Sequence, residues 1–391
     1  MSHVTYRNEP ERQARESLQR KAASVSAPGR HVDPLLLLAA LGLTAFGLLM
    51  IYSATFHGLE ARGADPMHFV NRQLISLVIG LAGMVGVALV DYRLYRAWAP
   101  LFYAVAVLML VITALTGQTV NASRAWIVFG GFQFQPAELA KPALILVLAA
   151  LFHERRESAL GLRALLEAIG LAAVPMLLIL AQPDLGTAIV FVAITFGVLL
   201  LARVRVRYMA ALALIGVLSI VGALQLDIME DYQVARLTSF IDPSADPGGA
   251  GYNVNQAQIA IGSGQLAGQG LFQGSQTSLA YVPENHTDFI FTVVGEELGF
   301  LGAGLVLVLY ALLLWRALRI TAMSRDTFGI LIGAGVVAVL GFQLFINVGM
   351  SVGVMPVTGL PLPFLSYGGT SLIGSFLMIG LLQNVHMRRF Q

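Results

Sequence analysis

Long apolar runs separated by short polar segments fill almost the whole chain. An α-helix needs about 20 apolar residues to cross the hydrocarbon core of a bilayer. The runs predict ten transmembrane helices, near residues 35–53, 73–90, 99–116, 137–152, 164–181, 185–202, 208–226, 288–314, 329–350 and 366–386. The pattern therefore predicts an all-α polytopic membrane protein.

The basic side chains between these runs predict the orientation of the chain, because cytoplasmic loops carry an excess of Lys and Arg. With the N-terminus in the cytoplasm, the residues on that side are Arg7, Arg12, Arg15, Arg20, Lys21, Arg30, Arg93, Arg96, Arg155, Arg156, Arg163, Arg203, Arg205, Arg207, Arg316, Arg319, Arg325, Arg388 and Arg389. The opposite side keeps only Arg62, Arg72, Arg124 and Arg236. We therefore expect a multi-pass membrane protein with both termini in the cytoplasm.

Two segments stand apart from the predicted helices. Residues 1–33 form a polar, basic cytoplasmic arm that lacks the apolar core and cleavage site of a signal peptide. Residues 34–391 form a single membrane domain, in which residues 227–287 make a large extracytoplasmic loop between the seventh and eighth helices. This loop is acidic and rich in glycine, and residues 253–261 predict a short amphipathic helix within it. A loop of this length in a compact protein is usually functional.

Composition narrows the possible chemistry. Hydrophobic residues make up 57% of the chain and charged residues 12%, whereas soluble domains carry about 25% charged residues. The chain has no cysteine, which excludes disulfides, thiolate metal sites and cysteine nucleophiles. Neither Lys21 nor Lys141 follows a glycine, so a Walker A nucleotide loop is also excluded. Energy for any reaction must come from the substrate or from an ion gradient.

A polar run, residues 283–288, leads directly into the eighth predicted helix. Thr287 could cap that helix and place Asp288 in its first turn, where the helix dipole favours an ionised carboxylate. Such a carboxylate could be a general base, or could bind a divalent cation such as Mg²⁺ or Mn²⁺. The alternative is that Asp288 and His286 only cap the helix. We favour a functional role, because a carboxylate at a membrane edge is costly and the long loop ends there.

Glu138 and Lys141 form a second candidate site. They are three residues apart on the fourth predicted helix and can therefore meet. Pro142 removes the amide that would bond the carbonyl of Glu138, so a kink is expected there. The pair is either a buried structural ion pair or an anchor for an anionic group of a substrate. The sequence leaves both readings open.

Two further helix starts carry polar groups. Asp184, in the run QPDLGT, is interpreted as the cap of the sixth predicted helix. Residues 359–371, which include Ser366, place glycines and hydroxyls at the start of the tenth. Exposed amides at a helix start make a natural phosphate site, and close packing of small residues is an equal alternative.

Three other polar groups are harder to assign. Arg124 and Trp126 are typical of an interfacial anchor, with phosphate binding by Arg124 as a lesser alternative. Glu296 and Glu297 point about 100° apart on their helix. At most one of them, with Glu296 the nearer, is expected to share a cavity with Asp288.

Together these stretches resemble the SEDS family (shape, elongation, division and sporulation), which includes the RodA and FtsW polymerases of bacterial peptidoglycan. The resemblance rests on five motifs in order: QPAELAK at 135–141, QPDLGT at 182–187, IAIGSG at 259–264, PENHTDFIF at 283–291 and LSYGG at 365–369. It covers the chain from the first predicted helix to the C-terminus. Residues 356–363 (PVTGLPLP) are more similar to the RodA branch than to the FtsW branch.

The resemblance implies a ten-helix glycosyltransferase of the bacterial cytoplasmic (inner) membrane, which polymerises lipid II at the outer face of that membrane during cell elongation and releases undecaprenyl pyrophosphate. It implies Asp288 as the catalytic residue, and Glu138, Lys141, Arg124, His286 and Ser366 as the expected substrate-binding groups. The implied partner is a class B penicillin-binding protein, together with membrane lipid and without nucleic acid. The alternatives are a lipid II flippase or another transporter, and a non-catalytic scaffold for the penicillin-binding protein.

Overall fold

The computed structural model describes residues 31–120, 123–129, 132–155, 161–226, 234, 236, 238, 240, 249–279 and 281–389. In this part of the chain, eight helices are long and apolar enough to cross a membrane. They are α2 (Pro34–Glu60), α3 (His68–Leu89), α4 (Tyr92–Thr116), α5 (Pro136–His153), α6 (Leu162–Leu180), α12 (Ile290–Ala322), α13 (Thr327–Ser351) and α14 (Gly369–Met387). Helices α7 (Leu185–Leu201) and α8 (Val206–Gln225) carry shorter apolar stretches. The chain is a helical, multi-pass membrane protein.

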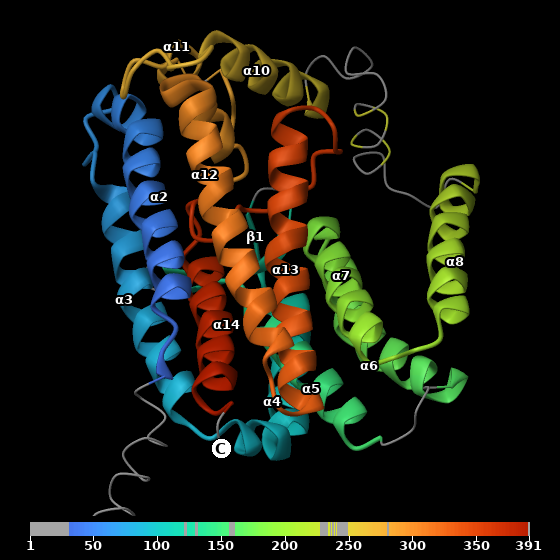
Figure 1. Ribbon diagram of the computed structural model, residues 1–391. Helices are drawn as coiled ribbons and strands as arrows, with labels where there is room; N and C mark the ends of the chain where they lie inside the picture. Colours follow the sequence, from blue (N-terminus) through green and yellow to red (C-terminus); the bar gives the residue numbers. More distant parts are fainter. Residues whose placement is uncertain are drawn as a thin grey trace, which may run out of the picture.

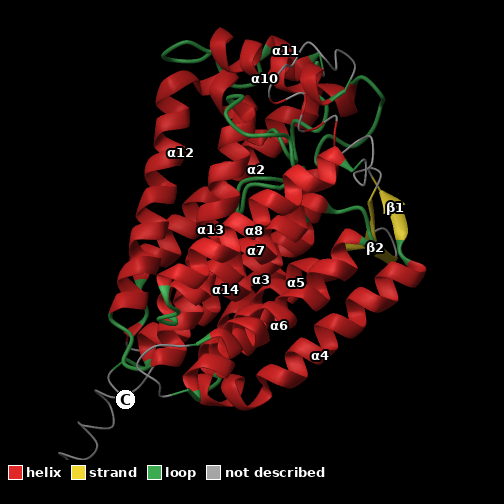
Figure 2. Ribbon diagram, turned by 90° about the vertical axis from the view of Figure 1, so that its right-hand side faces the viewer, coloured by secondary structure: helices red, strands yellow, loops and turns green. Residues whose placement is uncertain are grey.

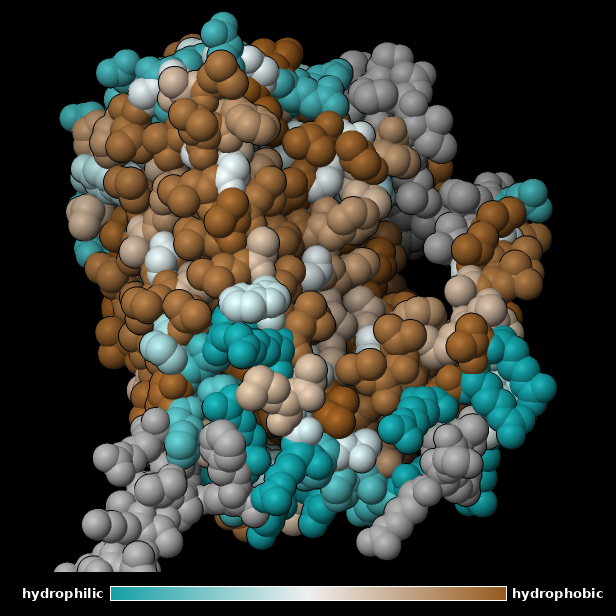
Figure 3. Space-filling model, viewed as in Figure 1, coloured by the Kyte–Doolittle hydropathy of each residue, from teal (hydrophilic) through white to brown (hydrophobic). Residues whose placement is uncertain are grey.

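The helices pack around α5, α13 and α14. Helix α5 contacts α4, α6, α7, α13 and α14, and most of its side chains are buried. Helix α8 lies apart from the bundle, beyond α7 (Figure 1). Hydrophobic side chains cover the middle of the molecule, and hydrophilic ones gather at its two ends (Figure 3). This distribution is what a bilayer requires of a protein that spans it.

A helix lies on each predicted apolar run, but one boundary differs from the sequence prediction. Helix α12 extends to Ala322, beyond the apolar run that ends at residue 314. The last turns of α12 contain the charged residues Arg316 and Arg319, and they reach the end of the bundle where α2 begins. Helix α5 runs as one helix through Pro142. Pro142 has no amide hydrogen to donate to the carbonyl of Glu138. A Cβ added to Gly374 would lie 3.2 Å from that carbonyl oxygen, so α14 packs closely against α5 there.

A small antiparallel sheet joins α4 to α5. Hydropathy does not predict it, because two of its strands have only three residues and the seven residues of the third do not alternate. It consists of β1 (Gln118–Val120), β2 (Ser123–Phe129) and β3 (Phe132–Phe134), in the order β1-β2-β3. The strands lie at the edge of the bundle beside α4 (Figure 2). Ser123 and Arg124 donate hydrogen bonds to the carbonyl of Gln182, which ties the sheet to the turn before α7.

The described part of the long loop docks on α12. Helix α10 (Ala250–Ser263) confirms the predicted short helix, and α11 (Ser275–Ser278) follows it. Helix α12 breaks at Gly299, where φ is +63°. Across the break, the amides of Gln269 and Gly270 donate to the carbonyls of Glu296 and Glu297, and those of Phe300 and Leu301 donate to Gln265 and Leu266. The loop therefore supplies hydrogen bonds that the broken helix loses. The arm up to residue 30 and most of the loop's acidic residues lie outside the described residues.

Candidate functional site

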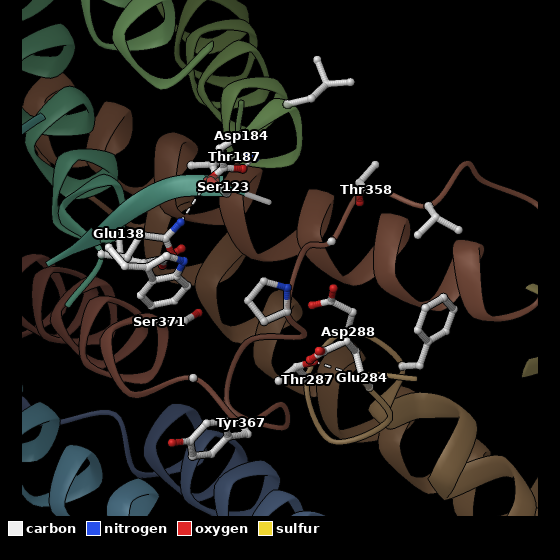
Figure 4. Close-up of a pocket in the computed structure, with 18 of the residues that line it drawn as sticks. Ser123, Glu138, Asp184, Thr187, Glu284, Thr287, Asp288, Thr358, Tyr367 and Ser371 are labelled. Atoms are coloured by element: carbon white, nitrogen blue, oxygen red, sulfur yellow. Dashed lines mark hydrogen bonds between the residues drawn. The ribbon is translucent and has the colours of Figure 1, made fainter. Parts of the chain in front are cut away.

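A cavity of about 390 Å³ opens at the end of the bundle that carries α10 and α11. Its lining comes from β2, the turn before α7, the segment before α12 and the segment between α13 and α14 (Figure 4). The residues that line it are Ser123, Trp126, Gln135, Glu138, Pro183, Asp184, Leu185, Thr187, Arg236, Asn253, Glu284, Thr287, Asp288, Phe289, Val357, Thr358, Gly359, Pro361, Tyr367, Gly368, Thr370 and Ser371. Among them are four carboxylates and one described cation, Arg236.

Four helix N-termini meet at this cavity. Helices α5, α7, α12 and α14 each place a residue of their first turn, or one directly before it, in the lining. Each N-terminus carries roughly half a positive charge on its free amides. That field explains how Glu138, Asp184, Glu284 and Asp288 can share one cavity, and it also favours an anionic ligand.

Asp288 lies just before α12 rather than in its first turn. The N-cap of α12 is Phe289, and the Thr287 hydroxyl donates to the carbonyl and carboxylate of Glu284 instead of capping the helix. The prediction that Thr287 caps the helix is therefore wrong, because residues 284–289 form their own turn, closed by the Phe289 amide on the Glu284 carbonyl. Asn347 donates to the Asp288 carbonyl at 2.7 Å.

The carboxyl of Asp288 is half-buried and faces the cavity. Burial, together with the negative charges of Glu284 and Asp184 and against the opposing charge of Arg236, raises its pKa to about 7. Gly359, at φ +74°, would bring a Cβ within 3.4 Å of Oδ2, so its missing side chain leaves the carboxyl accessible. A carboxyl that titrates near neutral pH and has free space beside it is suited to general base catalysis.

Glu138 and Lys141 form the predicted ion pair, with Nζ 2.6 Å from Oε1. Lys141 is fully buried, and Glu138 is 3% exposed. Glu138 lines the cavity, whereas Lys141 is not among its lining residues. The pair therefore faces the cavity with its carboxylate, and the ammonium group behind it compensates that charge.

Asp184 was interpreted only as a helix cap, and this role is confirmed. Its Oδ1 accepts the Thr187 amide at 3.0 Å, and its Oδ2 accepts Nε2 of Gln135 at 2.9 Å. Asp184 also lines the cavity, and burial raises its pKa while the hydrogen bonds from Thr187 lower it. One feature of the sequence points to this second role. The dipeptide Gln-Pro, followed within two residues by an acid, occurs at the start of both α5 and α7.

The other expected substrate-binding residues lie near the cavity but outside its lining. The ring of His286 packs on Phe69 and Tyr367, at 4.8 and 5.7 Å between centroids, and burial lowers its pKa. The hydroxyl oxygen of Ser366 accepts the Leu362 amide and closes a turn. Arg124 donates to the carbonyl of Gly117. Trp126, two residues further along β2, does line the cavity.

Glu296 and Glu297 are buried away from the cavity, so neither shares it with Asp288. Glu296 accepts the amides of Gln276 and Thr277 and the Thr277 hydroxyl, which holds α11. Glu297 accepts the hydroxyl of Ser53 on α2 at 2.6 and 2.7 Å. Both carboxylates therefore anchor the first part of α12 to its neighbours.

The similarity of this chain to known proteins extends over both the helical bundle and the residues that line the cavity. A sequence model of the FtsW, RodA and SpoVE family, described as cell cycle proteins, matches residues 33–391. The chain is 38% identical to Stage V sporulation protein E of Bacillus subtilis (strain 168), over 90% of this chain and 96% of that protein. It is also 38% identical to Peptidoglycan glycosyltransferase MrdB of Escherichia coli (strain K12), over 92% of this chain and 94% of that protein.

The fold is similar to that of a solved chain from work described as "Structural coordination of polymerization and crosslinking by a peptidoglycan synthase complex". The TM-score is 0.78 at 32% identity, and the match covers 92% of this chain and 99% of that chain. Because the identity is the same for the sporulation protein and for MrdB, it does not separate the branches of the family.

Proposed function

The chain belongs to the FtsW, RodA and SpoVE family, and we propose that it is a peptidoglycan glycosyltransferase that polymerises lipid II in the cavity around Asp288. The observation that carries this function is the half-buried carboxyl of Asp288, accessible in a cavity that four helix N-termini surround. This site joins a proton acceptor to a field that favours a phosphate anion.

The pyrophosphate of the donor lipid would bind between the start of α14 and Arg236. Gly368, Thr370 and Ser371 line the cavity at that helix start, where the first amides have no partner within their helix. Arg236 also lines the cavity, and its Nη1 lies 3.3 Å from the carbonyl of Thr358. Lys141 would act from behind, by holding Glu138 in place.

In the proposed reaction, a hydroxyl oxygen of the acceptor sugar attacks the anomeric carbon of the donor sugar. The new β-1,4 C–O bond forms as the bond from that carbon to the phosphate oxygen breaks, and undecaprenyl pyrophosphate leaves with the electron pair. The Asp288 carboxylate takes the proton of the attacking hydroxyl. No general acid is required, because pyrophosphate is a stable leaving group. The activated phosphate ester of the donor supplies the energy of the reaction, which agrees with the absence of a Walker A motif from the sequence.

A divalent cation, Mg²⁺ or Mn²⁺, is part of this proposal. No group of three or more His, Cys, Asp or Glu side chains in the described ranges is placed to hold a metal ion. Mg²⁺, however, is commonly bound by one or two carboxylates plus phosphate oxygens of the substrate. Asp288 fits that role, because the missing side chain of Gly359 leaves space beside its carboxyl in the cavity. When bound, the cation would neutralise the leaving pyrophosphate.

Chelation tests the cation directly. We expect EDTA to lower the rate of polymerisation by purified protein, and added Mg²⁺ or Mn²⁺ to restore it. A rate that stays unchanged in EDTA, with lipid II freed of metal, would contradict a role for the cation.

We further assign the chain to the RodA branch and give it ten transmembrane helices, with α7 and α8 counted among them. The branch rests on residues 356–363, which connect α13 to α14 and of which four line the cavity, namely Val357, Thr358, Gly359 and Pro361. We also propose that both termini lie in the cytoplasm and that the cavity opens at the outer face of the inner membrane, because an excess of Lys and Arg is typical of the cytoplasmic side. A class B penicillin-binding protein is the proposed partner, supported by the similarity to a chain of a peptidoglycan synthase complex.

Polymerisation of lipid II by the purified chain tests the proposed function. We expect glycan strands and undecaprenyl pyrophosphate to form in detergent or vesicles, in the presence of the partner. A flippase would instead move lipid II between leaflets without forming strands. A scaffold would form strands only through another enzyme, so a preparation in which the partner lacks any polymerase domain excludes that source.

The rate of polymerisation should depend on pH through Asp288. Its pKa of about 7 means that the carboxyl is protonated below that pH and cannot accept the proton of the sugar hydroxyl. We expect the rate to rise about tenfold per pH unit below pH 7 and to level off above it. The control is Glu284→Gln, which removes a negative charge that raises the pKa of Asp288. Its profile should shift to lower pH, and an unshifted profile would contradict the assignment.

A further inference from the structure

Gln73, a buried residue of α3, is hydrogen-bonded to the backbone directly before α14. Helix α3 packs beside α14 (Figure 1). Nε2 of Gln73 donates to the carbonyl of Ser366, and its Oε1 accepts the amide of Gly368, each at 3.1 Å. If the amide group were flipped, each of its ends would face a group of its own kind, so its orientation is fixed. One side chain therefore pairs two backbone groups that lie outside any helical ladder.

Tyr367, between these two backbone groups, links them to the turn that carries Asp288. Its amide donates to the carbonyl of His286 at 2.9 Å. The ring of Phe69, one helical turn before Gln73 on α3, packs on the rings of His286 and Tyr367, at 4.8 and 5.0 Å between centroids. The three residues before α14 thus connect α3 on one side with the catalytic turn on the other.

The same hydrogen bonds fix the start of α14. Gly368 is the N-cap of this helix, and its amide is the one that Gln73 accepts. The next three amides, those of Gly369, Thr370 and Ser371, have no hydrogen-bond partner in the described part of the chain. Thr370 and Ser371 line the cavity, and free amides at a helix start favour an anionic group. The direction of these amides depends on how the N-cap residue is held.

We propose that Gln73 is a positioning residue, which fixes the distance between Asp288 and the free amides of α14 that receive the pyrophosphate. The inference rests on the proposed function. In the proposed displacement, the attacking hydroxyl and the leaving phosphate lie on opposite sides of one carbon, so the proton acceptor and the anion site must keep a set separation. A misplacement of about 1 Å can cost about 10²-fold in rate. Gln73 acts on this separation without lining the cavity itself.

A second buried glutamine provides the matched control. Gln383 lies at the opposite end of α14, away from the cavity. Its Oε1 accepts the amide of Asp33 at 2.9 Å, and its Nε2 donates to the carbonyl of the same residue at 2.8 Å. It therefore makes the same two kinds of bond to the backbone before α2. Its substitution shows what the loss of such a contact does to the fold alone.

Kinetics with lipid II test the positioning role. Gln73→Met keeps the length of the side chain and removes both polar atoms, and it should lower kcat about tenfold while KM changes less than about threefold. Gln383→Met should lower the thermal unfolding midpoint in detergent by a similar amount and leave kcat and KM unchanged. An unchanged kcat in Gln73→Met, or an equal loss of kcat in both variants, overturns the role.

Gln73→Glu is a second variant, which also serves if Gln73→Met does not fold. A protonated carboxyl group can donate to the carbonyl of Ser366 and accept the amide of Gly368, whereas an ionised one can only accept. We therefore expect a rate close to that of the unsubstituted protein when the two are compared at the same acid pH. A variant that is equally slow at both ends of the pH range overturns the role.

Hydrogen exchange of the full chain, measured by mass spectrometry, separates this inference from the proposed function. Gln73→Met should speed exchange of the amides in residues 365–372 and in the turn at 284–289, because their hydrogen bonds open more often. Gln383→Met should leave both segments unchanged. Unchanged exchange in Gln73→Met overturns the inference. If the unsubstituted protein forms no polymer, the proposed function fails and the positioning role with it, while the exchange rates still decide whether Gln73 holds the two segments.

Discussion

Asp288→Asn should abolish polymerisation of lipid II while leaving the fold intact. Removal of a general base costs about 10²–10⁴-fold in rate, because the sugar hydroxyl keeps its proton as the glycosidic bond forms. Folding should not suffer, since the contact that Asn347 makes with residue 288 is to the main-chain carbonyl, which the substitution keeps. Burial disfavours the ionised carboxylate, so replacing it with a neutral amide of the same shape should not lower the stability of the fold.

The measurement is the rate of glycan strand formation by purified protein, with the thermal unfolding midpoint as the test of folding. Glu284→Gln is the matched control, because it removes a second carboxylate from the same cavity and should keep most of the activity above pH 7. An Asp288→Asn protein that makes strands at a near-normal rate would assign the chemistry elsewhere in the cavity. Loss of activity in both variants would point to the total charge of the cavity instead.

The helical bundle was predictable from sequence because the bilayer imposes it. Every backbone polar group in the hydrocarbon must be paired within a helix, so each spanning segment appears as a long apolar run. The same physics explains what was missed. Strands β1 to β3 lie in a connection outside the apolar runs; β1 and β3 have three residues each, and β2, which reads SRAWIVF, does not alternate between polar and apolar residues. The end of α12 was placed too early because hydropathy follows lipid contact, whereas a helix can continue in water.

The candidate site was predictable in its parts but not in its assembly. Asp288 and Glu138 could be selected because carboxylates next to apolar runs are rare and costly. The sequence could not show that both residues share a cavity with Asp184, because this depends on how four helix N-termini pack together. Asn347 gave no signal either, since a single amide within an apolar run is compatible with many roles. Its contacts with the carbonyls of Asp288 and Leu360 are visible only in the folded chain.

Breaking the Glu138–Lys141 pair should have the largest effect on stability of any single change near the cavity. Lys141 is fully buried and Glu138 nearly so, with their charged atoms 2.6 Å apart. Lys141→Met leaves a buried carboxylate without its counter-charge, which typically costs about 3–5 kcal/mol. The double variant Glu138→Gln/Lys141→Met removes both charges and should recover most of that loss. Thermal unfolding in detergent measures both effects.

Activity of the double variant then separates the two readings that the sequence leaves open. If the pair is only structural, a stable double variant should polymerise lipid II at a near-normal rate. We expect instead a stable protein with a lowered rate, because Glu138 lines the cavity opposite Asp288 and its carboxylate is exposed to whatever binds there (Figure 4). Lys141 contributes by holding that carboxylate in place, since its ammonium group lies behind it at 2.6 Å. A double variant with both full stability and full activity would reduce the pair to packing.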